Sequence, residues 1–159
     1  MSAADPHDRP EGATDAEVAA VGRLTEALEW VERARGHLYE FHQQMGHADG
    51  LLQEAADALE AAGHPAQAAV VRHELVGRNV VEGRWTFQVV EEFDDGYWSC
   101  VRSVEHDVRH ALLNGRRHVF ESELKDREMT PGSPAHRRRP PGTGTGGAGT
   151  PSGPAPPGS

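Results

Sequence analysis

Apolar residues in the first third of the chain recur at alternating spacings of three and four. Such spacing places side chains on one stripe of an α-helix, as in a coiled-coil seam. Thr14 and Glu17 form a capping-box pattern, and Gly46 is a typical end. The pattern predicts a helix over about residues 14–45, with the apolar stripe Val21, Leu24, Leu28, Val31, Leu38 and Met45.

Shorter helical patterns follow in the middle of the chain. Residues 48–62 carry leucines and alanines on one face, and Gly63 and Pro65 punctuate the end of this segment. Proline suits the first turn of a helix, so the next helix is predicted over about 65–76. Residues 77–83 are expected to form a connection.

A second long apolar stripe predicts a helix over 84–113, bent at Gly96, because proline-free helices bend where glycine interrupts them. Its inward positions include Phe87, Val90, Tyr97, Val101, Val104, Val108 and Ala111. A break at Gly96 is the alternative. Residues 116–127 can add a short fifth helix. No alternating pattern of a β-strand occurs, so the fold class is all-α.

Four helices joined by short loops alternate in direction. We therefore expect an antiparallel helical bundle of two long and two short helices, with a short fifth helix. The short helices cover only half of the long ones, so the fifth helix or a second subunit must cover the other half. We expect a homodimer whose interface includes Val21, Leu24, Leu28, Val104 and Val108, with Trp85 and Trp98 as anchors.

Composition bounds the domain and its setting. Residues 1–13 and 131–159 lack apolar periodicity and are expected to be disordered, which leaves a helical domain over 14–130. The net charge of −9 argues against nucleic-acid binding. No apolar run is long enough for a membrane span, and Cys100 is the only cysteine, so a cytoplasmic location is expected.

Polar residues on the inward stripes are the candidate site. Aligning the two long helices end to end places Arg35 opposite Asp94, and a buried guanidinium needs such a partner. Tyr39, His42 and His73 fall in the same half. One interpretation is a polar network that holds the helices in register. The other is a pocket for a small ligand, an anion or a metal.

Other sequence motifs give no catalytic or metal site. His106 and His110 have the spacing of a metal-binding pair, but the helical pattern places them on the wet face. The patterns of a phosphate-binding loop and of a nucleophile elbow are missing from the structured part. We therefore expect no cofactor, no metal and no catalytic residues.

The stretches GRNVVEGRWTFQVVEEFDDGYW and VRHALLNGRRHVFESELK resemble small helical proteins of GC-rich bacteria. The resemblance covers about residues 20–127. It implies a helical fold and assigns no activity, ligand or functional residue.

Two functional hypotheses follow. The first is a non-enzymatic interaction or scaffold protein that self-associates and can bind a protein partner. The alternative is a bundle that binds a ligand or a metal, with or without catalysis, through Arg35, Tyr39, His42, His73 and Asp94.

Overall fold

The computed structural model describes residues 5–136, and this part of the chain is mostly helical and has no β-strand. The all-α prediction is thereby confirmed. The elements are α1 (Asp15–Ala61), α2 (Pro65–Glu74), α3 (Thr86–Phe93), the π-helical turn η1 (Asp94–Trp98), α4 (Ser99–Leu113), α5 (Val119–Glu128) and the 3-10 turn η2 (Pro134–His136). None of the helices among residues 5–136 has the length and apolar content needed to cross a bilayer.

Helix α1 is a single element of 47 residues, so the predicted break at Gly46 is wrong. The apolar stripe continues with the same spacing through Leu52, Ala56 and Leu59. Ala56 is fully buried, as is Ala68 of α2. Packing of α2 on this part of α1 offsets the weak helix propensity of Gly46 and Gly50, each of which costs about 1 kcal/mol.

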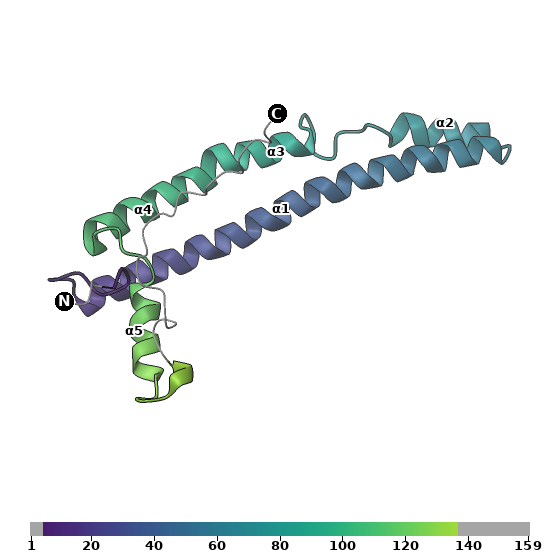
Figure 1. Cartoon of the computed structure of the whole chain (residues 1–159). Helices are drawn as coiled ribbons and strands as arrows, with labels where there is room; N and C mark the ends of the chain where they lie inside the picture. Colours follow the sequence, from purple (N-terminus) through teal and green to yellow (C-terminus); the bar gives the residue numbers. More distant parts are fainter. Residues whose placement is uncertain (1–4, 137–159) are drawn as a thin grey trace, which may run out of the picture.

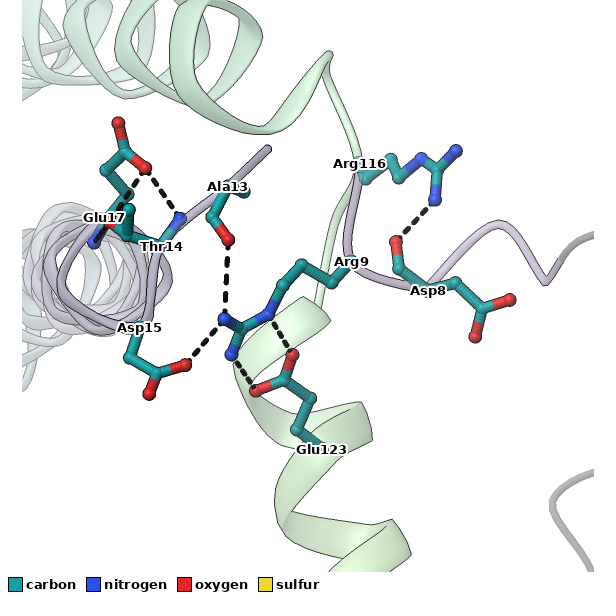
Figure 2. A network of polar contacts seen from close by, with 8 residues as sticks. All are labelled: Asp8, Arg9, Ala13, Thr14, Asp15, Glu17, Arg116 and Glu123. Atoms are coloured by element: carbon teal, nitrogen blue, oxygen red, sulfur yellow. Dashed lines mark hydrogen bonds and ion pairs between the residues drawn. The ribbon is translucent and has the colours of Figure 1, made fainter. Parts of the chain in front are cut away.

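The start of α1 matches the predicted capping box. The Glu17 amide donates to Thr14 Oγ1 at 3.2 Å, and the Thr14 amide donates to a Glu17 carboxylate oxygen at 2.7 Å (Figure 2). The Thr14 amide and the Thr14 hydroxyl both donate to the Glu17 carboxylate, and these two bonds lower the pKa of Glu17 below its ordinary value. The cap satisfies amides that the first helical turn leaves without partners.

The helices form a hairpin along α1 instead of the predicted four-helix bundle (Figure 1). Helix α2 folds back on the C-terminal end of α1, and the α3–η1–α4 segment runs back along the rest of it. Within residues 5–136, α2 contacts no helix other than α1, and α5 meets the hairpin only at its end. The hairpin is therefore one layer of paired helices, and no second layer covers its faces.

The predicted helix 84–113 forms as a helical segment over 86–113 with a π-helical turn around Gly96. A π turn inserts about one residue into the helix and changes which side chains face inward. Trp98 is half-buried, whereas Tyr97 is 61% exposed and Val104 is 49% exposed. The π turn therefore rotates Tyr97 and Val104 out of the predicted inward stripe.

The main apolar core lies where α1, α4 and α5 meet. Val18 and Val21 pack there with Leu113 and Val119, and each of these four side chains is at most 3% exposed. Helix α5 therefore covers one end of the long helices, which was one of the two predicted alternatives. Val21, predicted in a subunit interface, is covered within its own chain.

Residues 5–13, which we assigned to the N-terminal arm, contact α1 and α5 (Figure 2). Arg9 makes two hydrogen bonds to Glu123 of α5, at 2.6 and 2.8 Å, and also binds Asp15 at the start of α1. These bonds raise the pKa of Arg9 and lower that of Glu123. Most of the predicted disordered tail, residues 137–159, lies outside the described part.

Replacement of Leu113 by alanine is expected to lower the free energy of unfolding by about 2–4 kcal/mol, because it leaves a cavity in this core. Leu113 is 2% exposed, whereas its neighbour Leu112 is 36% exposed. Leu112→Ala should therefore cost less than half as much. Urea unfolding of both variants at one protein concentration measures the difference, and equal losses would contradict the described core.

Gly46→Ala is expected to stabilise the protein by about 0.5–1 kcal/mol, since alanine favours a helix interior and a β-carbon at this position meets no atom within 4 Å. Gly63→Ala is the matched comparison. Gly63 has a φ of +83°, so alanine there should destabilise by about 1–2 kcal/mol. Thermal unfolding tests both signs, and a loss of stability in Gly46→Ala would indicate a break in α1.

Candidate functional site

Arg35 of α1 and Asp94 of η1 form the predicted ion pair. Arg35 Nε donates to Asp94 Oδ1 at 2.7 Å, and Nη2 donates to Oδ2 at 2.8 Å, a two-pronged geometry that suits a carboxylate. Their side chains are 27% and 17% exposed. The pair therefore lies at an edge of the hairpin, not in the dry bundle interior that we expected, because no second layer covers it.

Two aromatic rings complete this cluster. Tyr39 donates its hydroxyl hydrogen to Asp94 Oδ2 at 3.1 Å, and the guanidinium of Arg35 lies 4.2 Å from the centre of the Trp98 ring. A cation over an aromatic face is attracted by the ring's electrons. The bonds from Arg35 and Tyr39 hold the pKa of Asp94 below its ordinary value, while Asp94 raises that of Arg35.

The two predicted histidines do not join this cluster directly. His42 Nδ1 lies 2.7 Å from Thr86 Oγ1, further along the same pair of helices. His73 lies on α2 with 86% of its side chain exposed, and its near partner is Glu74 at 2.9 Å. Three of the five predicted ligand-binding residues therefore meet, His42 lies along the same seam, and His73 lies elsewhere. Ligand binding by this set stays a prediction.

A second polar cluster was missed in the sequence. Glu105 of α4 is only 5% exposed, and it accepts hydrogen bonds from Thr25 at 3.1 Å and from Arg109 Nε at 2.8 Å. Arg109 also donates to the carbonyl of Gly115 at 2.6 Å. The spacing of Glu105 and Arg109 by four residues was a usable signal. The regular helix predicted over 84–113 has no π turn and therefore does not turn Glu105 toward α1, so the prediction did not include this cluster.

Both clusters lie on one side of the hairpin, which we call the polar face and define by Thr25, Tyr39, Asp94, Glu105 and Arg109. An open groove of about 600 Å³ lies beside the Glu105 cluster, with acidic and basic side chains from α1, α4 and the following loop. Charges of both signs line the groove, so it favours no single class of ion. Among residues 5–136, no group of three or more metal-binding side chains is close enough to hold an ion.

The opposite side of the hairpin is formed by every seventh residue of α1 from Ala20, and by the equivalent positions of the returning segment, which directly precede Val90, Trp98, Glu105 and Leu112. In an antiparallel pair, one helix runs in the opposite direction and also faces the other helix. Each of these two changes moves the preceding position to the other side of the inward residues, so together they cancel. These residues of two antiparallel helices therefore share one side. We call this side the apolar face and define it by Ala20, Ala27, Ala34 and Phe41 of α1 and by Val89, Tyr97, Val104 and Ala111 of the returning segment.

The apolar face has no charged residue and is open to solvent. Phe41 is 37%, Tyr97 is 61% and Val104 is 49% exposed, and the alanines are exposed as well. Contiguous apolar surface of this kind marks interaction sites in soluble proteins. Its chemistry is suited to packing against another apolar surface, since it offers neither a nucleophile nor a charged group.

The predicted interface residues fall into different environments. Leu24, Leu28 and Val108 are half-buried in the seam, and Val21 is buried. Trp98 is half-buried beneath the guanidinium groups of Arg35 and Arg102. In contrast, Val104 lies on the apolar face and Trp85 is 60% exposed at the start of α3.

The Arg35–Asp94 pair should contribute to stability in a pH-dependent way. Because the folded-state pKa of Asp94 is lowered, its contribution is present above the unfolded value of about 3.9 and is lost as the pH falls through the folded value. At pH 6, Arg35→Met should therefore destabilise more than the double variant Arg35→Met/Asp94→Leu does, because the single change leaves the carboxylate without its cation.

Urea unfolding of the wild type and of the variants at pH 6 and at about pH 2.5, which is below the unfolded value of about 3.9, tests this pair. The advantage of the wild type over the double variant should shrink at the lower pH. Additive effects of the two substitutions, or an advantage that does not depend on pH, would rule out a stabilising pair.

Comparisons with protein families, with curated proteins and with solved structures found no match to this chain. The functional argument therefore depends on the geometry of the two faces.

Proposed function

We propose that this protein is a non-enzymatic helical scaffold that self-associates through its apolar face. The observation that carries the proposal is the row of uncharged side chains that α1 and the returning segment place on one side of the hairpin. It has no charged group and no cover within residues 5–136. We place the scaffold in the cytoplasm, because the exposed thiol of Cys100 suits a reducing compartment.

The balance of buried and exposed side chains supports association. Within residues 5–136, seven apolar side chains are buried, whereas fifteen large apolar side chains are exposed. Three of the fifteen, Phe41, Tyr97 and Val104, lie on the apolar face. Leaving a large apolar side chain in water forgoes about 1.5–3 kcal/mol of stabilisation. A single-layer hairpin therefore gains considerably when its open face is covered by another protein surface.

The polar face supports the same function by holding the helices in register. Its hydrogen bonds join α1 to the returning segment at two levels, through Thr25 and Glu105 and through Arg35 and Asp94. Half-buried polar pairs of this kind are satisfied only in one alignment of the helices. The same alignment keeps the alanines of α1 level with the larger side chains of α4.

A ligand-binding function has weaker support. Arg35, Tyr39 and Asp94 use their polar atoms on one another, and His73 lies on another helix with its side chain exposed. A ligand would have to displace strong charge-assisted bonds to enter this cluster. We therefore do not favour the alternative function.

Sedimentation equilibrium of the whole chain tests self-association. At about 50 µM, well above a typical micromolar dissociation constant, the mass is expected to exceed the 17.2 kDa of one chain. Ala34→Glu places a charge in the middle of the apolar face and should weaken association by at least about tenfold, because the charge would have to be desolvated.

Ala69→Glu is the matched control. It introduces the same charge at an exposed alanine of α2, away from the apolar face, and should leave association unchanged. Circular dichroism should report the same helix content for both variants. A wild-type chain that stays monomeric at this concentration would refute the proposed function.

A further inference from the structure

We infer that a second copy of this chain occupies the apolar face and that the pair forms a four-helix bundle with a two-fold axis along the hairpin. In this arrangement α1 of one copy lies against α4 of the other at the same level. The inference rests on the proposed self-association and goes further, because it specifies which helices meet and in what register.

The size of the side chains supports this pairing. The hydrogen bonds of the polar face fix which residues of α1 and of the returning segment lie side by side within one chain. Thr25 bonds to Glu105, and Arg35 bonds to Asp94. On the apolar face, Ala27 is therefore level with Val104, and Ala34 is level with Tyr97. Ala27 and Ala34 of α1 thus accompany larger residues of α4 and η1, which leaves room for a partner's large side chains above these two alanines.

A two-fold rotation about the long axis keeps each residue at its level and exchanges the positions of α1 and α4. Tyr97 of the partner subunit then lies over Ala34, and Val104 of the partner subunit lies over Ala27. Every helix has antiparallel neighbours, as in a regular four-helix bundle. Because the contacts are reciprocal, the interface closes at two copies and leaves no face for a third.

The residues along the outer edges of the apolar face, its rim, also match those of the partner copy in this arrangement. Arg23 and Trp30 lie along the outer edge on α1, and Asp107 and Cys100 lie along the outer edge on α4. The register brings Arg23 toward Asp107 of the partner subunit and Trp30 toward Cys100 of the partner subunit. Arg23 is 85% and Asp107 is 73% exposed by side chain, and Trp30 is 62% exposed, so a partner can reach all three. Within the chain Arg23 pairs with Glu26 at 3.4 Å and Asp107 with His106 at 3.2 Å, so the contacts across the dimer would add to these exposed pairs or replace them.

The area also agrees with a stable dimer. The face extends from residue 20 to residue 41 of α1, which is roughly 33 Å of helix at 1.5 Å per residue. Two adjacent helices are about 20 Å wide, which makes the face roughly 650 Å². This value is close to the roughly 800 Å² that each partner buries in a standard interface.

Helix α5 is not available as an alternative cover. Phe120 packs against Gly22 so closely that a β-carbon at Gly22 would come within 3.1 Å of it. Arg9 holds the same helix through Glu123. The loop before α5 lies beside the polar groove, through Arg117 and His118. Helix α5 is therefore fixed beside Gly22, where it borders the edge of the apolar face at Arg23 and leaves Ala20 and Ala27 exposed.

Disulfide trapping tests the register. Ala27→Cys and Val104→Cys are each made with Cys100→Ser, and one of the two proteins carries a size tag. After mixing and mild oxidation, we expect the mixed disulfide between position 27 of one chain and position 104 of the other. Position 27 should not cross-link to itself, because the two copies of α1 lie diagonally across the bundle.

A second pair of variants tests the rim. Arg23→Asp and Asp107→Arg should each weaken the dimer by about two- to fivefold, the range for an exposed ion pair, and their combination should restore its affinity. In the wild type, the reactivity of the Cys100 thiol should fall as the protein concentration rises. It should stay constant in Ala34→Glu.

The outcomes separate the two proposals. Dimers that form disulfides between two copies of position 27, or that form no mixed disulfide, would overturn the register and leave self-association intact. A chain that stays monomeric in sedimentation would overturn both proposals. The mixed disulfide together with rescue by the double rim variant would support the four-helix arrangement.

Discussion

The inward stripe of α1 is the feature on which the rest of the structure depends. It repeats every three and four residues over nearly the whole helix, and α2, the returning segment and α5 all contact this one helix. Helix α2 contacts only α1 among the described helices, and α5 is held by α1, by Leu113 at the end of α4 and by Arg9. A change that breaks α1 would therefore separate the parts of the fold from one another.

The π turn η1 decides how the returning segment presents its side chains. The extra residue turns Trp98 toward Arg35 of α1 and Glu105 toward Thr25 of α1. It also turns Tyr97 and Val104 outward. Polar contacts thus gather on one side of the hairpin and apolar side chains on the other. Without this insertion the valine and tyrosine would fill the seam, and the hairpin would have no separate apolar face.

The two faces divide the physical tasks of the proposed scaffold. Hydrogen bonds and ion pairs add little net stability at an edge that water reaches, but they are satisfied in only one register. Apolar packing is less directional and provides most of the free energy of association. A hairpin aligned by its polar face can therefore present matched rows of small and large side chains to another surface.

The sequence by itself determined the helices and several of their ends. Periodicity and caps are local, so the Thr14 cap, the start of α2 at Pro65 and the helical content of 86–113 could be predicted. The alignment of two long helices was enough to pair Arg35 with Asp94, since helix length alone places them opposite each other.

Only the tertiary structure decided what lies beyond these local patterns. It carried α1 through Gly46 and Gly50, because packing of Ala56 against α2 outweighs the weak helix propensity of these two glycines. It inserted the π turn, buried Glu105, covered Val21 with α5 and left His73 in solvent. Each outcome depends on contacts between segments far apart in the chain, and the spacing of residues within one segment contains no information about such contacts.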